Sequence, residues 1–384
     1  MARNLKARLE RIRTIEPPRG NGKVELETAP KVKAQSRENA ATWPGWTDAG
    51  HMTIKREFCR SLPLHVPLDF PDALAVLLPD MACRDGRRQM MDLSANDELL
   101  FFDLETTGLS GGAGTIAFLA AFGRFTKSDE ITITQYLLLD YPGEPDFLEN
   151  LAAEFSATVP PYMVSYNGKS FDSQIFKNRL LMNGIRPPEY RQADLLHPAR
   201  RLWKRRLPDC SQATIEVEIL GLDRTGDVSG ALAPDIWFSF LRNGERGDLL
   251  SICEHNAKDI AGLGTMFLAI GEIAGDPIGS REKYQFDEEG LALYWRNALR
   301  KRHAHLAGDE AYRKLVKTGD FLLSSAAEKG YPRAAVVMAK NAEWRMCDIK
   351  LALRYTNMAL ENCGDMENLR DELIKRRARL ERKL

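Results

Sequence analysis

Hydrophobic and polar residues follow two different periods along this chain. Between residues 98 and 140, short apolar runs are separated by glycines and polar turns, which predicts strands. The expected strands are Leu99–Asp103, Thr115–Phe125, Glu130–Leu139 and, further on, Tyr162–Tyr166. From residue 144 onward, apolar positions recur mostly every three or four residues, which is the helical period.

This periodicity predicts helices on both sides of Pro277. Before it, helices are expected at Glu144–Thr158, from an N-cap at Ser170 to Gly184, and at Leu195–Leu207, Ser211–Leu220, Pro234–Leu241 and Gly247–Ala274. Beyond it no strand pattern is found, and helices are expected at Asp309–Lys329, Pro332–Met346, Asp348–Asn362 and Met366–Lys383. The predicted fold class is therefore a mixed α/β sheet flanked by helices, followed by an all-α C-terminal region.

The same pattern divides the chain into four segments. Residues 1–42 are polar, with six basic and two acidic residues in the first twenty, and we expect a disordered basic tail. Residues 43–97 are expected to form a strand-rich N-terminal extension, residues 98–276 the α/β domain, and residues 277–384 the helical region. Ala352, Tyr355 and Ala359 give that region a tetratricopeptide-like character. Because a free-standing solenoid needs about three repeats, we expect these helices to dock on the α/β domain.

Composition narrows the possible partners and compartment. Lys plus Arg equals Asp plus Glu, 54 each, so any basic footprint for nucleic acid must be local. The six cysteines form no Cys-x-x-Cys pair, which argues against a zinc site or a disulfide framework and favours reduced thiols in the cytoplasm. The first residues lack the apolar core of a signal peptide, and no run approaches the roughly 18 apolar residues of a membrane helix.

Two carboxylates, Asp103 and Glu105, come at the end of an apolar run. Strand side chains alternate between faces, so both are expected on the same side of the sheet. Like charges this close repel unless a cation lies between them, and Mg²⁺ prefers such oxygen ligands. A lone Asp-x-Glu also occurs by chance at solvated strand ends, so the rest of the chain must decide.

Two further acidic motifs follow. Asp172 is expected in the first turn of a helix, where a carboxylate is favourable in any protein. His255 and Asp259 are four residues apart on the long predicted helix and therefore share a face. Such a pair, taken alone, is more often a surface ion pair than a catalytic one.

Together, the three motifs resemble the DEDD superfamily of 3′→5′ exonucleases, which have an RNase H-like fold. The matching features are Asp103-x-Glu105 followed by Thr-x-Gly, Asn167 ahead of Phe171-Asp172, and His255 ahead of Asp259. Within that superfamily, residues 98–274 are most similar to the YprB-type RNase H-like predicted nucleases. The stretches that carry this similarity are 194–203, 206–211, 215–221 and 254–256.

The resemblance implies a divalent-metal-dependent nuclease, acting 3′→5′ on single-stranded ends of DNA or RNA. Two Mg²⁺ or Mn²⁺ ions would be held by the carboxylates Asp103, Glu105, Asp172 and Asp259, with His255 as a further catalytic residue. Three residues separate His255 from Asp259, which is the spacing of the Tyr-bearing DEDD branch rather than the His-bearing one. This departure leaves the role of His255 open.

Candidates for substrate binding lie near these motifs. They are Thr106, Asn167, Lys169, Arg200, Arg201, Arg205 and Arg206. The basic segment 200–206 holds five cations around Trp203, which suits a nucleic-acid backbone with a stacked base, although a buried tryptophan in a basic helix fits equally well.

The alternative is a non-catalytic nucleic-acid-binding or scaffold protein whose C-terminal helices recruit a protein partner. Every candidate catalytic residue precedes Pro277. We therefore expect the helical region to be dispensable for chemistry.

Overall fold

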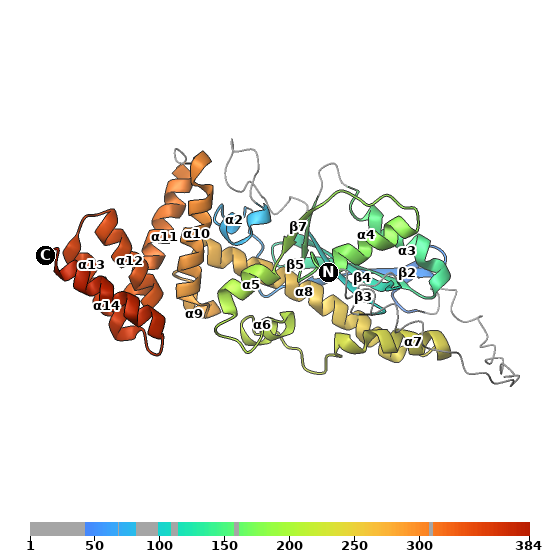
Figure 1. Ribbon diagram of the computed structural model, residues 1–384. Coiled ribbons are helices and arrows are strands. Elements are labelled where there is room, and N and C mark those ends of the chain that lie inside the picture. The colour runs from blue at the N-terminus through green and yellow to red at the C-terminus, as the bar shows by residue number, and fades with distance from the viewer. Residues whose placement is uncertain (1–42, 68, 82–98, 109–113, 157–160, 307–309) are drawn as a thin grey trace, which may run out of the picture. The chain divides into compact units, whose positions relative to one another are not determined.

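The computed structural model describes residues 43–67, 69–81, 99–108, 114–156, 161–306 and 310–384 (Figure 1). They all belong to one compact unit, Gln35–Leu384. The expected basic tail at 1–42 and the last part of the expected extension, 82–97, lie outside the described residues. Within the part that is described, no helix combines the length and the apolar character that a membrane span needs.

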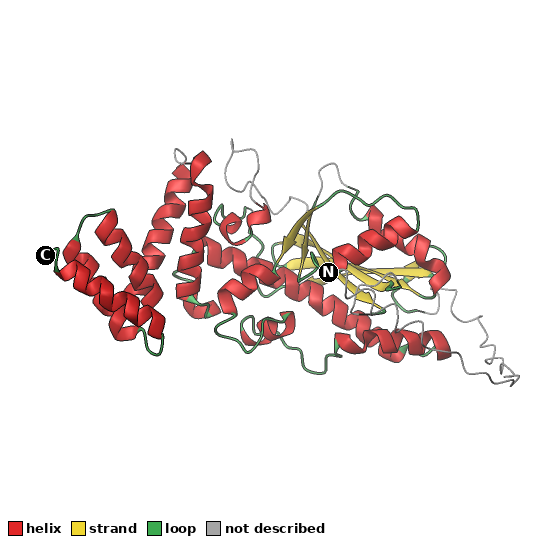
Figure 2. Cartoon of the chain, viewed as in Figure 1, coloured by secondary structure: helices red, strands yellow, loops and turns green. Residues whose placement is uncertain are grey.

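A seven-stranded mixed sheet forms the centre of the α/β part (Figure 2). Its order is β1 (Thr47–Asp48), β2 (Thr53–Ser61), β5 (Glu130–Leu138), β4 (Ala117–Lys127), β3 (Leu99–Thr106), β6 (Tyr162–Ser165) and β7 (Arg191–Asp194). The pairs β1–β2, β2–β5, β5–β4 and β4–β3 are antiparallel, whereas the pairs β3–β6 and β6–β7 are parallel. The predicted mixed sheet is confirmed.

Strand β3 lies inside the sheet, and its first four residues are buried because helices cover both faces. Phe101 packs against Phe267 of α8 (Gly247–Gly275), with ring centroids 5.8 Å apart. Phe102 faces the other side and packs against Phe176 of α4 (Asp172–Met182) at 5.7 Å. Since side chains alternate along a strand, the next odd-numbered positions after Phe101 share its α8 face. This register places the two acidic residues of β3 on that face.

The other elements before residue 277 are short. They are α2 (Leu74–Leu77), α3 (Glu144–Ala153), α5 (Leu196–Trp203), α6 (Gln212–Glu218) and α7 (Ala233–Asn243), with the 3₁₀ turns η3 (Pro79–Met81), η4 (Tyr141–Gly143) and η5 (Gly230–Leu232). The helix predicted from Ser211 is α6, and the Ser211 side chain caps it by accepting a hydrogen bond from the Thr214 amide. The N-cap predicted at Ser170 is wrong, because α4 begins at Asp172 and no side chain caps it.

Strand β7 was not predicted. Its sequence, Arg191-Gln-Ala-Asp194, holds a single apolar residue and therefore has no strand pattern of its own. It becomes a strand because residues 191–194 pair in parallel with β6. Tertiary pairing, rather than local propensity, decides its structure.

The chain ends in an all-helical region. Its members are α9 (Arg281–Tyr284), α10 (Glu288–Leu306), α11 (Glu310–Glu328), α12 (Pro332–Trp344), α13 (Ile349–Asn362) and α14 (Glu367–Glu381). From α10 onward, each helix packs against the next (Figure 1). The four helices predicted for this region correspond to α11–α14. Helix α10 was missed, because charged residues interrupt its buried stripe of Leu291, Trp295 and Leu299.

The helical region is docked on the α/β part, as expected, and the contact runs through α5. Trp203 is fully buried, and its indole N–H donates to the carbonyl oxygen of Tyr284 at 2.9 Å. The Asp287 amide donates to the Leu202 carbonyl oxygen at 2.7 Å. Trp203 and Trp295 belong to one continuous apolar core that also includes Phe101 of the sheet. The two parts therefore share a core.

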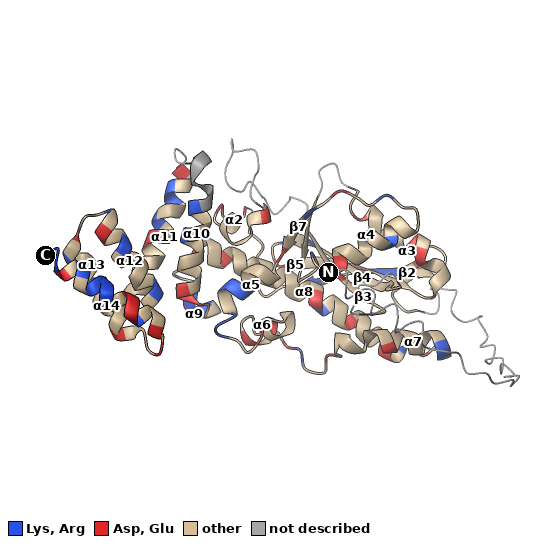
Figure 3. Cartoon of the chain, viewed as in Figure 1, with Lys and Arg blue, Asp and Glu red and all other residues tan. Residues whose placement is uncertain are grey.

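An ion-pair cluster joins α12 to the end of the chain, where Lys, Arg, Asp and Glu lie on the same helices (Figure 3). The buried Glu343 carboxylate accepts from Arg376 at 2.6 Å, from Arg379 at 2.7 Å and from Lys383 at 2.9 Å. These contacts, above all the hydrogen bond from Arg379, lower the pKa of Glu343 to about 2. A charge that is this well compensated stabilises the packing of α14 on α12.

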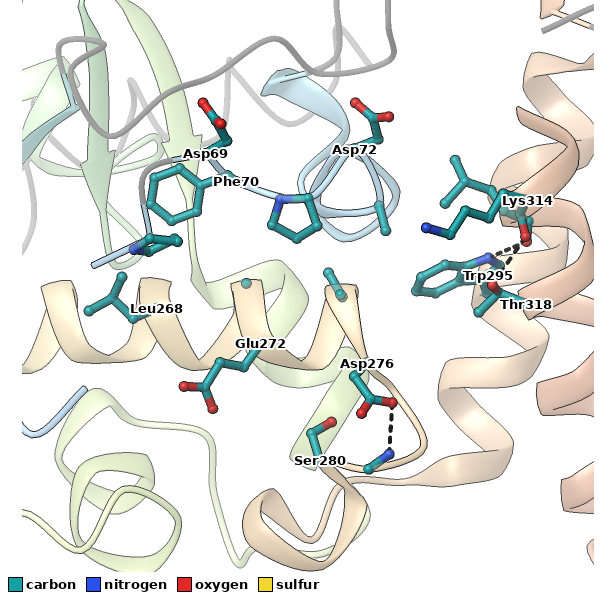
Figure 4. A pocket seen from close by; sticks show the side chains of 18 of the residues that line it. Asp69, Phe70, Asp72, Leu268, Glu272, Asp276, Ser280, Trp295, Lys314 and Thr318 are labelled. Carbon is teal, nitrogen blue, oxygen red and sulfur yellow. Dashed lines mark hydrogen bonds between the residues drawn. The ribbon is translucent and has the colours of Figure 1, made fainter. Parts of the chain in front are cut away.

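A cavity of 1090 Å³ lies beside the C-terminal half of α8 (Figure 4). Residues 65, 67 and 69–73 also line it, together with α9, α10 and α11. Its surface is mixed, with Phe70 and Leu268 beside Glu272 and Lys314. None of the acidic residues singled out by the sequence lines this cavity, so the candidate site must be sought elsewhere.

Candidate active site

The predicted acidic residues meet on the α8 face of the sheet. Asp103 and Glu105 come from β3, Asp172 opens α4 beside the end of β6, and Asp259 lies on α8. Glu105 interacts electrostatically with the other three carboxylates, and Asp172 with Asp103. His255, one helical turn before Asp259, joins the group. The structure therefore brings together all five residues that were predicted from the sequence to be catalytic.

Asp103 is oriented by two buried amides. The side-chain amide of Asn256 donates to Asp103 Oδ2 at 2.7 Å. The Asn256 oxygen accepts in turn from Gln135 Nε2 at 2.7 Å, and the same nitrogen lies 2.8 Å from the Cys253 carbonyl oxygen. Both Asn256 and Gln135 are fully buried. This chain of hydrogen bonds fixes one oxygen of Asp103 and leaves the other for a ligand.

Asp172 is placed by the loop that precedes α4. Asp194 accepts hydrogen bonds from the backbone amides of Asn167 at 2.9 Å and Lys169 at 3.2 Å. Asn167 has a positive φ of 61°, a conformation that asparagine tolerates better than most residues. A Cβ at Gly168 would lie 2.5 Å from Ser165 Oγ and 3.0 Å from Asp172 Oδ2, so a larger residue would displace Ser165 and crowd the Asp172 carboxylate. The loop is thus built around the carboxylate that it positions.

His255 lies between two carboxylates. Its Nδ1 is 2.9 Å from Asp227 Oδ2, and its Nε2 is 3.4 Å from Asp259 Oδ2. The pKa of Asp227 is lowered, since hydrogen bonds from Arg224 and His255 outweigh the effect of burial. As an ionised carboxylate only accepts, Nδ1 carries the proton toward Asp227. Nε2 is the nitrogen that faces the acidic cluster.

Burial and mutual repulsion raise the pKa values of Asp103, Glu105 and Asp172. The pKa of Asp103 is raised to about 7, first by burial and then by Asp259. Burial and the neighbouring carboxylates also hold the pKa values of Glu105 and Asp172 well above their usual range. The ionised cluster is therefore costly without a cation to balance it. Perturbed groups of this kind concentrate at functional sites.

The donor set fits a hard divalent cation. Ligand atoms of Glu105, His255 and Asp259 all lie within 4.8 Å of one another. The backbone of Gly230 borders the same space, where a Cβ would come within 3.1 Å of His255 Nε2 and 3.8 Å of Glu105 Oε1. Carboxylate oxygens with one imidazole suit Mg²⁺ or Mn²⁺. A glycine at 230 keeps the space open.

The loop residues nominated for substrate binding lie at the rim of this cluster. Asn167 is exposed, and Lys169 is exposed with its Nζ 3.0 Å from Asp80 Oδ2. Thr106 is buried, and its hydroxyl donates to the Gly108 carbonyl oxygen at 3.0 Å. Thr106 therefore shapes the turn after β3, while the other two face solvent beside Asp172.

The basic segment 200–206 is only partly available to a ligand. Trp203 is fully buried, so it cannot stack on a base, and the second of the two interpretations left open above is the one observed. Arg201 lies over the Tyr294 ring at 4.1 Å, and Arg205 pairs with Asp287 at 3.1 Å. Arg200 and Arg206 are exposed at the two ends of the segment.

The sequence did not single out several residues of the site as functional. They are Gln135, Asn256, Asp227, Arg224, Glu216 and Gly230. Asn256 lies next to His255 in the motif, but its partner Gln135 is 121 residues away, and only the fold reveals the pair. Asp194 stood in a stretch that carried the family resemblance, yet its three backbone contacts could not be read from that stretch.

Comparison with known families agrees with this geometry. Residues 100–270 match the family model described as RNase_H superfamily. The match runs from β3 almost to the end of α8 and includes all four clustered carboxylates and His255. This part of the chain is therefore similar to the RNase H superfamily.

A particular relative can be named as well. Over 175 residues the chain is 38% identical to "Uncharacterized protein YprB" of Bacillus subtilis (strain 168). The alignment covers 45% of this chain and 41% of YprB, so the similarity spans less than half of either protein. The name of that protein states no activity.

Proposed function

We propose that this chain is a divalent-metal-dependent nuclease that hydrolyses phosphodiester bonds, acting 3′→5′ from single-stranded ends. One observation carries the proposal: three carboxyls whose pKa values are raised by burial and mutual repulsion converge with a His–Asp pair within the residues that match the RNase H superfamily model. The order of Asp103, Glu105, Asp172 and Asp259 along the chain supports the exonucleolytic polarity, because it resembles that of the DEDD exonucleases.

The proposed chemistry divides between the carboxylates and His255. Asp103, Glu105, Asp172 and Asp259 would hold two Mg²⁺ or Mn²⁺ ions, which supply Lewis-acid polarisation of the phosphate and lower the pKa of a nearby water. His255 Nε2 accepts the proton of the attacking water, while Nδ1 remains hydrogen-bonded to Asp227. The low-dielectric surroundings of the three buried carboxyls strengthen every interaction with the reacting phosphate.

Substrate contacts are assigned by exposure. Asn167 and Lys169 stand beside Asp172 and would bind the sugar or phosphate next to the scissile bond. Arg200 and Arg206 would attract the strand backbone electrostatically. Arg201 and Arg205 have partners within the protein, and we assign them a secondary role in holding α5 in place.

The direct test uses full-length protein and single-stranded DNA and RNA labelled at the 5′ end. With Mg²⁺ or Mn²⁺ we expect a ladder of products that shortens with time, and with excess chelator no cleavage. A matched substrate with a blocked 3′ end should resist degradation. Cleavage in chelator would contradict the metal requirement. Internal cleavage of the blocked substrate would contradict digestion from the 3′ end.

A second role is proposed for the C-terminal helices, namely binding of a protein partner. Phe321, Trp344 and Met346 are 55%, 64% and 61% exposed, and they are the candidate apolar contacts for such a partner. If the chain proves inactive on every substrate and with every metal, a non-catalytic scaffold that uses these helices is the remaining function.

A further inference from the structure

The loop between α6 and α7 places one arginine at the back of the acidic cluster. Arg224 contacts three carboxylates that come from three different segments. Its Nε donates to Glu216 of α6 at 2.6 Å, its Nη1 donates to Asp227 of the same loop at 2.6 Å, and its Nη2 donates to Asp259 Oδ1 of α8. The Arg224 side chain is 10% exposed, so these contacts are largely shielded from solvent.

The position of Arg224 decides which oxygens the cluster presents. Because Nη2 occupies Oδ1 of Asp259, the other oxygen, Oδ2, is the one that lies 3.4 Å from His255 Nε2. The Asp227 oxygen that accepts from Arg224 also accepts from His255 Nδ1. One planar guanidinium therefore fixes the carboxylates on both sides of His255.

Glu216 anchors the guanidinium from behind. Its side chain is fully buried, and it lies against α8 at Gly262, where any Cβ would overlap the Glu216 carboxylate. Gln212 adds support, because its Nε2 donates to Glu216 Oε1 at 2.8 Å and to the Asp259 carbonyl oxygen at 2.7 Å. A glycine on one helix and a buried acid on another are thus both needed to hold Arg224.

We propose that Arg224 is a positioning residue that tunes the metal affinity of the site by presenting Asp259 Oδ2 to the ion. This inference rests on the proposed metal-dependent function and deepens it. Residues that orient a metal-binding side chain through its second atom typically change metal affinity by about 10–100-fold when they are replaced. The planar fork of arginine is required, since lysine carries the charge without the fixed geometry.

The opposite role for Arg224 makes a distinct prediction. If the guanidinium merely competed with the ion for Asp259, its removal would strengthen metal binding. The anchoring by Glu216 argues against competition, because a side chain held by two further carboxylates keeps its place when Asp259 acquires another partner.

The test measures Mn²⁺ binding to full-length protein by isothermal titration calorimetry, with thermal unfolding in Mn²⁺ and in chelator as a second readout. We expect Arg224→Gln to weaken binding by about 10–100-fold. Arg224→Lys should recover only part of the affinity, and Glu216→Gln should cause a smaller loss. The matched control is Arg179→Gln, because Arg179 forms a similarly buried pair with Glu144 away from the cluster. It should lower stability in chelator without changing the affinity for Mn²⁺.

Each outcome decides the matter. Wild-type or tighter affinity in Arg224→Gln, or full affinity in Arg224→Lys, overturns the positioning role but leaves the metal site standing. If Arg224→Gln does not fold, the affinity of Arg224→Lys decides alone. Absence of Mn²⁺ binding by the wild-type protein overturns the proposed metal-dependent function, and this inference with it.

Discussion

Asp103 and Glu343 are acidic residues with opposite electrostatic surroundings. Around Glu343, Arg376, Arg379 and Lys383 lower the carboxyl pKa to about 2. Around Asp103, burial and a neighbouring carboxylate raise the pKa to about 7. Cations of the protein itself balance the charge of Glu343, whereas the surroundings of Asp103 disfavour its ionised form. A fold retains uncompensated buried charge where function uses it, so the contrast separates a structural ion pair from a candidate site.

The largest expected effect comes from removing the helical region that contains Glu343. A chain that ends at Asp276 loses Tyr284, the acceptor for the buried Trp203 indole, together with Trp295 of the shared core. We expect it to unfold or aggregate, contrary to the dispensability that the sequence led us to expect. Soluble yield and thermal unfolding measure this. A folded, active 1–276 chain would show that the shared core is not needed.

Asp103→Asn should have the largest effect on activity. A bound ion is worth several kcal/mol in the transition state and each 1.4 kcal/mol is a factor of ten, so we expect a rate loss of about 10³-fold. In chelator the same substitution should raise the unfolding temperature, because it removes a repulsive buried charge. The control is Glu149→Gln, at an exposed position of α3. Unchanged activity would exclude Asp103 from the chemistry.

His255→Ala removes the imidazole that lies between Asp227 and Asp259. Loss of a general base lowers the rate by about 10²–10⁴. We expect a fall in kcat in this range and a flatter acid limb of the pH–rate profile. His255→Tyr should restore part of the rate, in keeping with the spacing to Asp259. Near-normal kcat between pH 6 and 8 would leave this histidine a purely structural role.

Glu343→Gln tests the compensated region. Hydrogen bonds to charged groups are worth about 1.5–3 kcal/mol, and we expect the free energy of unfolding to fall by roughly that amount. Nuclease activity should be unchanged, because Glu343 lies in the helical region. Glu361→Gln, at an exposed position of α13, is the control and should alter neither property. A stability gain in Glu343→Gln would show that burial outweighs the three cations.

The smallest effect concerns pH. In chelator, Asp103 binds its proton more tightly in the folded state, so its contribution favours folding below pH 3.8 and is lost as the pH rises through about 7. Glu343 does the reverse, since its contribution is present above pH 4.5 and is lost as the pH falls toward about 2. Each group changes the free energy of unfolding by up to about 1.4 kcal/mol per pH unit. Urea titrations across pH 3–8 give the free energy of unfolding at each pH. Asp103→Asn should remove a fall of this free energy with rising pH, and Glu343→Gln should remove a rise. A change of the same sign in both variants would contradict the contrast.

The sequence predicted those parts of the site that lie on regular elements. The two-residue period of β3 placed Asp103 with Glu105, and the helical period of α8 placed His255 with Asp259. The loop residues Arg224 and Asp227 belong to no period, and their partners lie up to 35 residues away. Sequence periodicity reports which face a residue occupies, but not which distant side chain meets it.

The same limit explains the misses in the fold. Strand β7 and helix α10 lack a clean hydrophobic pattern in the sequence. Their structure depends on pairing and packing with neighbouring elements. Trp203 illustrates the ambiguity, since a tryptophan among five cations suits both a base-stacking platform and a helix packed on its apolar side. Only the contact with Tyr284 distinguishes the two.

The hydrogen bond from Asn256 to Asp103 has a consequence for the order of folding. The two residues are 153 positions apart, so closing the loop between them carries a large entropic cost that only later contacts offset. A nascent chain that ends before α8 already holds Asp103, Glu105 and Asp172 but lacks both Asn256 and Asp259. The complete constellation can therefore form only after α8 has been synthesised and has docked on the sheet, which keeps partly made chains inactive.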